Sequence, residues 1–234
     1  MLDEKPLIVV GIPAYNEERT IAKVVLQARK HADVVVVCDD GSSDMTGEIA
    51  ETLGAVVVRH EGNLGYGAAI QALFKMAKKL ERYELAWLEE PLMPDDIDGL
   101  VELRRKVDVP IATGEHEYTR WGTRELLTRG AVDVLQLDVT WGGGITEMKK
   151  VCALASAEGV PVIPHAGWSE PAQCITFSEP KQVCPMIEYL VKWAVIQQAF
   201  NKRKLTPEKG CFHPPSKIGL GFEPQMDKLV EEES

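Results

Sequence analysis

Short runs of apolar, mostly β-branched residues alternate with amphipathic segments of helical period along most of the chain. Parallel strands connected by crossover helices produce this alternation. The pattern predicts eight strands, at residues 7–12, 34–38, 55–59, 85–88, 110–113, 132–137, 160–164 and 185–189. The chain is therefore expected to have an α/β fold throughout.

Residues that favour helix N-termini precede three of the predicted helices. Ser42, Ser43 and Asp44 come before the segment 45–53, Asp95 and Asp96 before 97–107, and Thr119 before 120–130. After residue 189 the pattern changes to one amphipathic helix at 191–202, and a loop-rich tail with four prolines follows. We expect the tail to lie on the surface.

Composition and charge exclude several classes of protein. The 234 residues are 45% hydrophobic and carry a formal net charge of -10 without a basic stripe, so a nucleic-acid partner is not expected. The five cysteines are widely spaced and include no CxxC pair, which predicts neither a disulfide framework nor a zinc site and favours a reducing, cytoplasmic setting. Apolar runs are too short to span a bilayer, so the chain is expected to be soluble.

A first set of polar residues follows the first two predicted strands. Pro13, Tyr15 and Glu17 come just after the first strand, and Asp39 and Asp40 come at the end of the second. Open parallel sheets bind ligands at the carboxyl ends of their strands, where a carboxylate can accept hydrogen bonds from a nucleobase or a ribose. These residues therefore indicate a nucleoside site, although an Asp-Gly-Ser turn can also serve only to start a helix.

Together with the segment RHEGNLGYGAAIQALF, these residues make positions 6–80 resemble the inverting family 2 glycosyltransferases of the dolichyl-phosphate mannose synthase type. The resemblance implies that Pro13, Tyr15, Glu17 and Asp39 hold the nucleotide of a nucleotide-sugar, with Asp40 near the diphosphate. That family has an Asp-x-Asp metal motif after its fourth strand, whereas this chain reads Leu88-Glu89-Glu90. Neighbouring side chains on a strand point to opposite faces, so we expect nucleotide binding without glycosyl transfer.

A second set of acidic and histidine residues follows the later strands: Glu89, Glu115, Asp138, His165 and Glu188. The carboxyl ends of barrel strands converge on one mouth, so these side chains are expected to meet there. Carboxylates suit Mg²⁺, and an aspartate that orients a histidine leaves one ring nitrogen for proton transfer. Each residue alone also has a simpler interpretation, as a solvated strand-end charge or a structural histidine.

Residues 83–225, with the motifs WLEEPLMPDD, IATGEHEY, LQLDVTWGGGITE and VIPHAGW, resemble the C-terminal barrel of the mandelate racemase group of the enolase superfamily, most closely rhamnonate and related sugar-acid dehydratases. The resemblance implies that Glu89 and Glu115 bind Mg²⁺, that Asp138 and His165 form the catalytic pair, and that Glu188 is an acid near the substrate. The family's capping domain and its first metal ligand, an aspartate, have no counterpart here, which predicts weak Mg²⁺ binding and impaired dehydration.

Together the two resemblances predict a recombined or engineered chimera, with a glycosyltransferase-like half at residues 1–81 and an enolase-superfamily half at 82–234. The predicted fold is a (β/α)8 TIM-like barrel built from three glycosyltransferase-like units and five barrel strands, and the alternative is an open Rossmann-like sheet plus a half-barrel. The predicted function is that of a Mg²⁺-dependent sugar-acid dehydratase. The alternatives are a nucleotide-sugar binding module and a chain without natural activity, and a homo-oligomer is left open.

Overall fold

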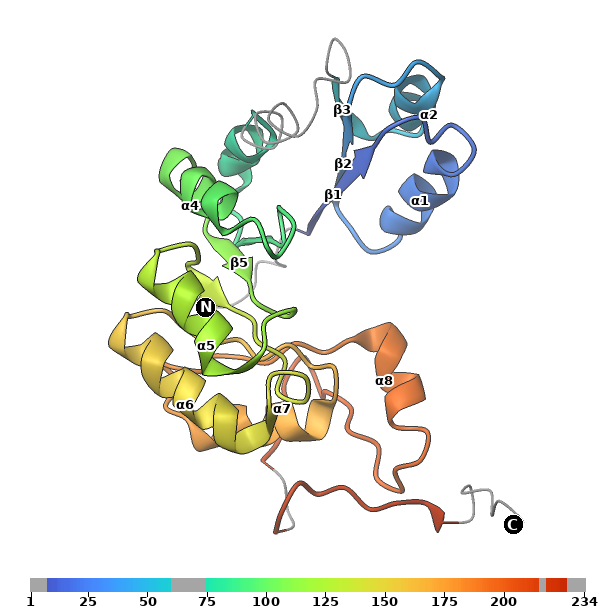
Figure 1. Cartoon of the computed structure of the whole chain (residues 1–234). Helices are drawn as coiled ribbons and strands as arrows, with labels where there is room; N and C mark the ends of the chain where they lie inside the picture. The colour runs from blue at the N-terminus through green and yellow to red at the C-terminus, as the bar shows by residue number, and fades with distance from the viewer. Residues whose placement is uncertain (1–7, 60–74, 215–217, 227–234) are drawn as a thin grey trace, which may run out of the picture. The chain divides into compact units, whose positions relative to one another are not determined.

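The computed structural model describes residues 8–59, 75–214 and 218–226. These residues form two compact units. Unit 1 comprises Met1–Leu92 and Glu102–Pro110, and unit 2 comprises Met93–Val101 and Ile111–Ser234. Each unit is a parallel α/β structure, as the hydrophobic pattern predicts (Figure 1).

Unit 1 is built around a parallel three-stranded sheet in the order β1 (Val9–Ala14), β2 (Val34–Asp39) and β3 (Val56–Arg59). α1 (Ile21–Ala28) connects the first two strands and α2 (Thr46–Thr52) the second two. Both helices lie on one side of the sheet (Figure 1), as crossover connections of constant hand require.

The run of four valines in β2 reflects burial on both faces of the sheet. Val35 and Val37 pack into a core with Ile21 and Val25 of α1. Val36 faces the opposite way and packs with residues of the helical segment 75–80. A strand that is covered on both faces is apolar at every position rather than at alternate positions.

The rest of unit 1 contains short elements. The 3-10 helix η1 (Glu81–Tyr83) follows the helical segment 75–80, and β4 (Leu88–Glu89) is a two-residue strand. α4 (Ile97–Lys106) begins in unit 2 and ends in unit 1. Within unit 1, the amide of Leu88 donates to the carbonyl of Pro110 at 2.7 Å.

Unit 2 has two paired parallel strands, β5 (Ile111–Thr113) and β6 (Val134–Leu135). Its other helices are α5 (Thr119–Thr128), α6 (Gly144–Ala157), α7 (Ser169–Ser178) and α8 (Val191–Gln197). The strands and helices enclose a core whose largest fully buried apolar side chains include Ile111, Leu126, Leu135, Leu137, Met148 and Ile175.

Two of the predicted helix starts carry the expected side-chain hydrogen bonds. Asp44 accepts from the amide of Thr46 at 2.9 Å, and Asp96 accepts from the amide of Gly99 at 3.0 Å. The third helix, α5, begins at Thr119 itself rather than after it. α8 ends at Gln197, earlier than predicted, and the side chain of the next residue, Gln198, donates to the carbonyl of Leu205 at 2.9 Å.

The last two predicted strands differ from the structure. The segment 160–164 makes only isolated bridges, from Val162 to Leu135 and from His165 to Asp138, and the segment 185–189 is not a strand. The reason is that Pro161, Pro164 and Pro185 have no amide hydrogen to donate to a neighbouring strand. Closure of a single eight-stranded barrel stays a prediction.

None of the helices in the described part of the chain is long and apolar enough to cross a membrane.

Truncation of a buried strand residue tests the core of unit 2. We expect Leu135→Ala to lower the free energy of unfolding by about 2–5 kcal/mol, because Leu135 is 0% exposed and its loss leaves a cavity. The matched control, Val195→Ala on α8, is 76% exposed and should change it by less than about 0.5 kcal/mol. Urea unfolding followed by circular dichroism measures both, and equal effects would contradict the packing described here.

Candidate active site

The centre of the candidate site is the carboxylate of Asp138, which is 0% exposed and lies three residues after β6. Its Oδ1 accepts from the amides of Thr140 at 2.7 Å and Trp141 at 3.0 Å, and from the hydroxyl of Thr140. Its Oδ2 accepts from the amide of Gly167 at 2.7 Å and faces His165 Nδ1 at 2.8 Å. Burial alone would raise the pKa of Asp138, but these hydrogen bonds outweigh it and hold the pKa below its usual value.

His165 is oriented by this carboxylate. Because an ionised carboxylate only accepts, Nδ1 of His165 carries the hydrogen and Nε2 is left to exchange a proton. Nε2 lies 3.2 Å from Oε2 of Glu115 and 4.0 Å from Oε2 of Glu188. Burial would lower the pKa of His165, but the hydrogen bond with Asp138 and the charges of Glu188 and Glu115 raise it above the usual value.

Glu115 and Glu188 reach His165 from different parts of unit 2. Glu115 comes two residues after β5, beyond Gly114, whose φ of 126° is a conformation that favours glycine. Glu188 lies on the segment after α7, where its amide donates to the carbonyl of Pro164 at 3.3 Å and its Oε1 accepts from the side chain of Gln136. The structure thus brings together four predicted residues: Glu115, Asp138, His165 and Glu188.

Four residues around the dyad were not identified from the sequence. Gln136 contacts Glu188, and Thr140 and Gly167 donate to Asp138. The ring of Trp141 lies 5.4 Å from the ring of His165, centroid to centroid, with a tilt of 44°. The motif LQLDVTWGGG contains three of these residues, and a turn that directs backbone amides at its aspartate is the signal that could have identified Thr140.

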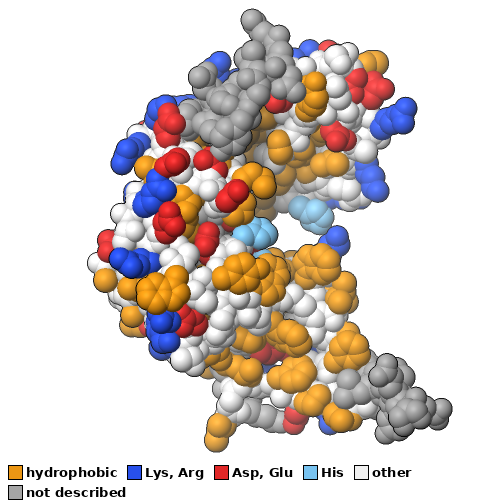
Figure 2. All heavy atoms as spheres, viewed as in Figure 1, with side chains coloured by type: hydrophobic (Ala, Val, Ile, Leu, Met, Phe, Trp, Pro, Cys, Tyr) orange, Lys and Arg blue, Asp and Glu red, His pale blue; other side chains and the backbone are white. Residues whose placement is uncertain are grey.

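Several aromatic side chains are exposed on the surface of unit 2. Hydrophobic side chains gather over the elements of unit 2 in Figure 2, and the exposed aromatic ones include Tyr118, Trp121, Trp141, Trp168 and Trp193. Trp141 is 49% exposed although it lies against the buried His165. An exposed indole beside a buried histidine offers an apolar face to a ligand.

Glu89 lies in unit 1, at the end of β4, where its Oε2 accepts from the indole of Trp87 at 2.9 Å. Glu90 follows outside the strand with φ of 42°. The predicted role of Glu89 as a metal ligand beside Glu115 stays a prediction. His60 and Glu61, which could replace the family's first ligand, lie outside the described residues.

Carboxylate oxygens are the ligands that Mg²⁺ prefers, so Glu115 suits it chemically. Within the described ranges, no three histidine, cysteine, aspartate or glutamate side chains are grouped so as to hold a metal ion.

The predicted nucleotide-binding residues lie together at the carboxyl ends of β1 and β2 in unit 1. Tyr15 is 45% exposed, whereas Asp39 is 4% exposed and accepts from the amide of Ser42 at 2.9 Å. The amide of Asp40 donates to the carbonyl of Ala14 at 2.9 Å, and the amide of Glu17 donates to the hydroxyl of Thr46 at 2.7 Å. These contacts show that Asp39 and Glu17 help to hold the loops at this edge of the sheet.

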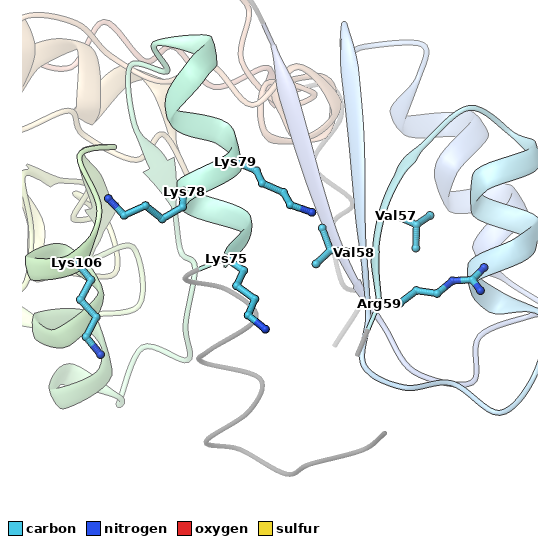
Figure 3. A pocket seen from close by; sticks show the side chains of 7 residues that line it. All are labelled: Val57, Val58, Arg59, Lys75, Lys78, Lys79 and Lys106. Carbon is cyan, nitrogen blue, oxygen red and sulfur yellow. The ribbon is translucent and has the colours of Figure 1, made fainter. Parts of the chain in front are cut away.

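A cavity of about 620 Å³ in unit 1 lies elsewhere and is lined by Val57, Val58, Arg59, Lys75, Lys78, Lys79 and Lys106 (Figure 3). Arg59 turns away from it toward α2, where its guanidinium pairs with Glu48 at 2.8 Å and Glu51 at 3.3 Å. None of the predicted nucleotide-binding residues lines this cavity.

Comparison with known proteins identifies the family. Residues 44–228, more than three quarters of the chain, match the family described as "Enolase C-terminal domain-like", and the chain belongs to this family. The match crosses the predicted boundary at residues 81/82 and includes residues 44–80, so the enolase-type region is longer than the resemblance of residues 83–225 indicated.

Among curated relatives, the chain is 50% identical over 93 residues to an L-rhamnonate dehydratase of Saccharopolyspora erythraea. That alignment covers 39% of this chain and 24% of the relative, so the chain spans about a quarter of that relative's length.

Solved structures share the fold over almost the whole chain. The 3,6-anhydro-D-galactonate cycloisomerase of Zobellia galactanivorans matches with a TM-score of 0.61 and 24% identity, over 96% of this chain and 66% of that one. A racemase of Streptomyces coelicolor A3(2) with bound magnesium matches with a TM-score of 0.63 and 22% identity, over 97% of this chain and 63% of that one. These similarities show that the chain shares the fold of these structures.

The raised pKa of His165 is testable without a ligand. In metal-free buffer we expect Asp138→Asn to lower the pKa of His165. Burial lowers this pKa, and the variant removes the carboxylate whose hydrogen bond chiefly opposes that effect. In the unmodified chain the pKa of His165 is higher in the folded state than in the unfolded state, so protonation of His165 stabilises the fold. This contribution is complete below the ordinary value of 6.5 and is lost as the pH rises through the folded pKa.

The measurement is an NMR titration of the His165 ring proton, assigned with His165→Asn, in buffer that contains a chelator. Asp95→Asn, the same change at an exposed position of unit 2, serves as the control. A His165 that titrates at the same or a higher pH in Asp138→Asn would show that this carboxylate does not set its protonation.

Proposed function

We propose that this chain carries the proton-abstracting half of a sugar-acid dehydratase site of the enolase superfamily. The single observation that carries the proposal is the buried Asp138–His165 pair, whose outer ring nitrogen faces two carboxylates, Glu115 and Glu188. Membership of the enolase C-terminal domain-like family and the similarity to an L-rhamnonate dehydratase support a hydroxylated carboxylic acid as the substrate.

In the proposed reaction, Nε2 of neutral His165 removes the proton from the carbon next to the substrate carboxylate. Asp138 holds the imidazole in the required tautomer and stabilises the imidazolium that forms. Bound Mg²⁺ would supply positive charge for the substrate carboxylate, and Glu115 and Glu89 are the proposed ligands. Glu188, in its protonated form, is proposed to act as the acid toward the departing β-hydroxyl.

The substrate's carbon chain is proposed to lie against Trp141, because this ring is exposed and adjacent to His165. Glu188 and Gln136, whose side chains contact each other, are proposed to form hydrogen bonds with hydroxyl groups of the substrate. A cytoplasmic location and self-association also remain proposals.

Solvent deuterium exchange tests the proposed function, because proton abstraction needs fewer positioned groups than complete dehydration. With Mg²⁺ in D₂O, we expect exchange at the α-carbon of L-rhamnonate or a related sugar acid. His165→Asn should lower the rate by about 10²–10⁴-fold, since it removes the general base. Proton NMR of the sugar acid measures the exchange.

Two matched variants control this experiment. His213→Asn, whose side chain is 73% exposed, should leave the exchange unchanged, and so should Glu158→Gln at the exposed end of α6. Glu115→Gln is expected to weaken the dependence on Mg²⁺. Exchange that persists at the parental rate in His165→Asn would remove this histidine from the mechanism.

A second candidate function is weak nucleotide binding by the strand ends of unit 1. It is favoured by one observation, the grouping of the exposed ring of Tyr15 with Asp39 and Asp40, which all precede the family match at residue 44. As part of this second candidate we also propose that residues 6–80 have a glycosyltransferase-like origin, which would make the chain a chimera.

Titration with uridine and guanosine diphosphate by calorimetry tests the second candidate. We expect weak binding that Tyr15→Ala reduces through loss of a stacking surface and that Asp39→Ala abolishes. Because Asp39 also holds the turn at Ser42, circular dichroism has to show that the variant is folded. Identical titrations for the parent chain and a folded Asp39→Ala would rule out the nucleotide site.

A further inference from the structure

Two buried cysteines of unit 2, Cys152 and Cys184, lie in contact with each other. Cys152 is on α6, and Cys184 is on the segment that follows α7. Their sulfur atoms are 3.9 Å apart, the side chains are 1% and 2% exposed, and both thiols are free. The proposed reaction uses neither of them.

Contacts of neighbouring residues position the two sulfur atoms. Lys149 lies one helical turn before Cys152, and its ammonium pairs with Glu179, five residues before Cys184. The amide of Cys184 donates to the carbonyl of Pro180 at 3.0 Å, which closes a tight turn directly before the thiol. The ion pair between Lys149 and Glu179 and the turn at Pro180 therefore lie close to the two cysteines and help to hold their sulfur atoms near each other.

We propose that Cys152 and Cys184 are a reversible oxidation site at which a hydroperoxide forms a disulfide between α6 and the segment that carries Glu188. A disulfide bond is about 2.05 Å long, so the sulfurs have to approach by roughly 2 Å, within reach of side-chain rotation and a small backbone shift. Hydrogen bonding from Cys184 lowers the pKa of the Cys152 thiol, and the same contact together with burial raises that of Cys184. Cys152 is the attacking sulfur on this basis.

The reaction balances with one hydroperoxide. The thiolate of Cys152 attacks hydrogen peroxide, the O–O bond breaks, and hydroxide leaves and takes up the proton that the thiol released, giving water and a sulfenic acid. The sulfur of Cys184 then attacks the sulfenic sulfur, the S–O bond breaks, and a second water leaves with the proton of Cys184. Two thiols are oxidised to one disulfide and one peroxide is reduced to two waters.

The site is connected to the proposed active site through the backbone. Val183, next to Cys184, accepts from the amide of Val162 at 2.7 Å, and Glu188 donates to Pro164 at 3.3 Å. Both contacts lie on the segment that leads into His165. A disulfide at Cys184 would tie α6 to this segment and restrict the movement of Glu188.

The test uses the full chain, oxidised with hydrogen peroxide at low protein concentration, then denatured, alkylated, digested and analysed by mass spectrometry. We expect a cross-linked peptide that joins Cys152 to Cys184, with only three of the five cysteines alkylated, and dithiothreitol should restore all five. Cys211→Ser, at an exposed position, is the matched control and should keep the cross-link. Cys184→Ala should abolish it.

The parent chain alone is sufficient to overturn the proposal, so a variant that fails to fold does not weaken the test. Oxidation of the exposed Cys211 shows that the peroxide has acted. If Cys152 and Cys184 are then both still fully alkylated, the oxidation site does not exist. The same conclusion follows if these two cysteines pair no more often with each other than with the remaining cysteines. Amide hydrogen exchange of residues 183–188 should be slower in the oxidised chain, and unchanged exchange would overturn the connection to Glu188. Neither readout depends on sugar-acid chemistry.

Discussion

The candidate site depends on one buried charge, the carboxylate of Asp138. Removal of a carboxylate from water carries a large free-energy cost unless hydrogen bonds replace the lost hydration. Here the donors are three backbone amides, one hydroxyl and one imidazole, all within unit 2. The loop from Thr140 to Trp141 and the turn at Gly167 are held in place because their amides converge on these two oxygens.

This arrangement also sets the chemistry of His165. With Oδ2 shared between Gly167 and His165 Nδ1, the ring has one orientation and one tautomer, and Nε2 is directed at Glu115 and Glu188. Gly167 is required sterically rather than for its backbone angle. A Cβ at this position would lie 2.3 Å from Oδ2 of Asp138, closer than any stable contact, so an amide donor can approach the carboxylate here only from glycine.

The sequence was sufficient to predict the parallel α/β class, the first three strands to within two residues, and the meeting of Glu115 with Asp138, His165 and Glu188. Those predictions rest on strand periodicity and on the convergence of strand ends, which are local or topological properties. The predicted strands at 160–164 and 185–189 were wrong because their prolines remove ladder donors although the residues around them are apolar. Gln136 and Trp141 were missed because a glutamine on a strand and a tryptophan in a turn have no chemical signature until their neighbours are known.

The failure of those two segments to form strands has a consequence for the site. The amides of Ile163 and His165 donate to the carbonyls of Leu135 and Leu137, so backbone hydrogen bonds hold the segment that carries the histidine. Glu188 lies on a segment that is not a strand, where its amide donates to the carbonyl of Pro164. Segments with few backbone hydrogen bonds open locally at lower free energy than a paired strand. The position of Glu188 relative to Nε2 therefore depends on side-chain contacts, chiefly that of Gln136, and on the packing of the segment around Cys184 against α6. The dyad is held by the Asp138 carboxylate and by backbone hydrogen bonds, whereas Glu188 is held by its amide contact with Pro164 and by side-chain contacts.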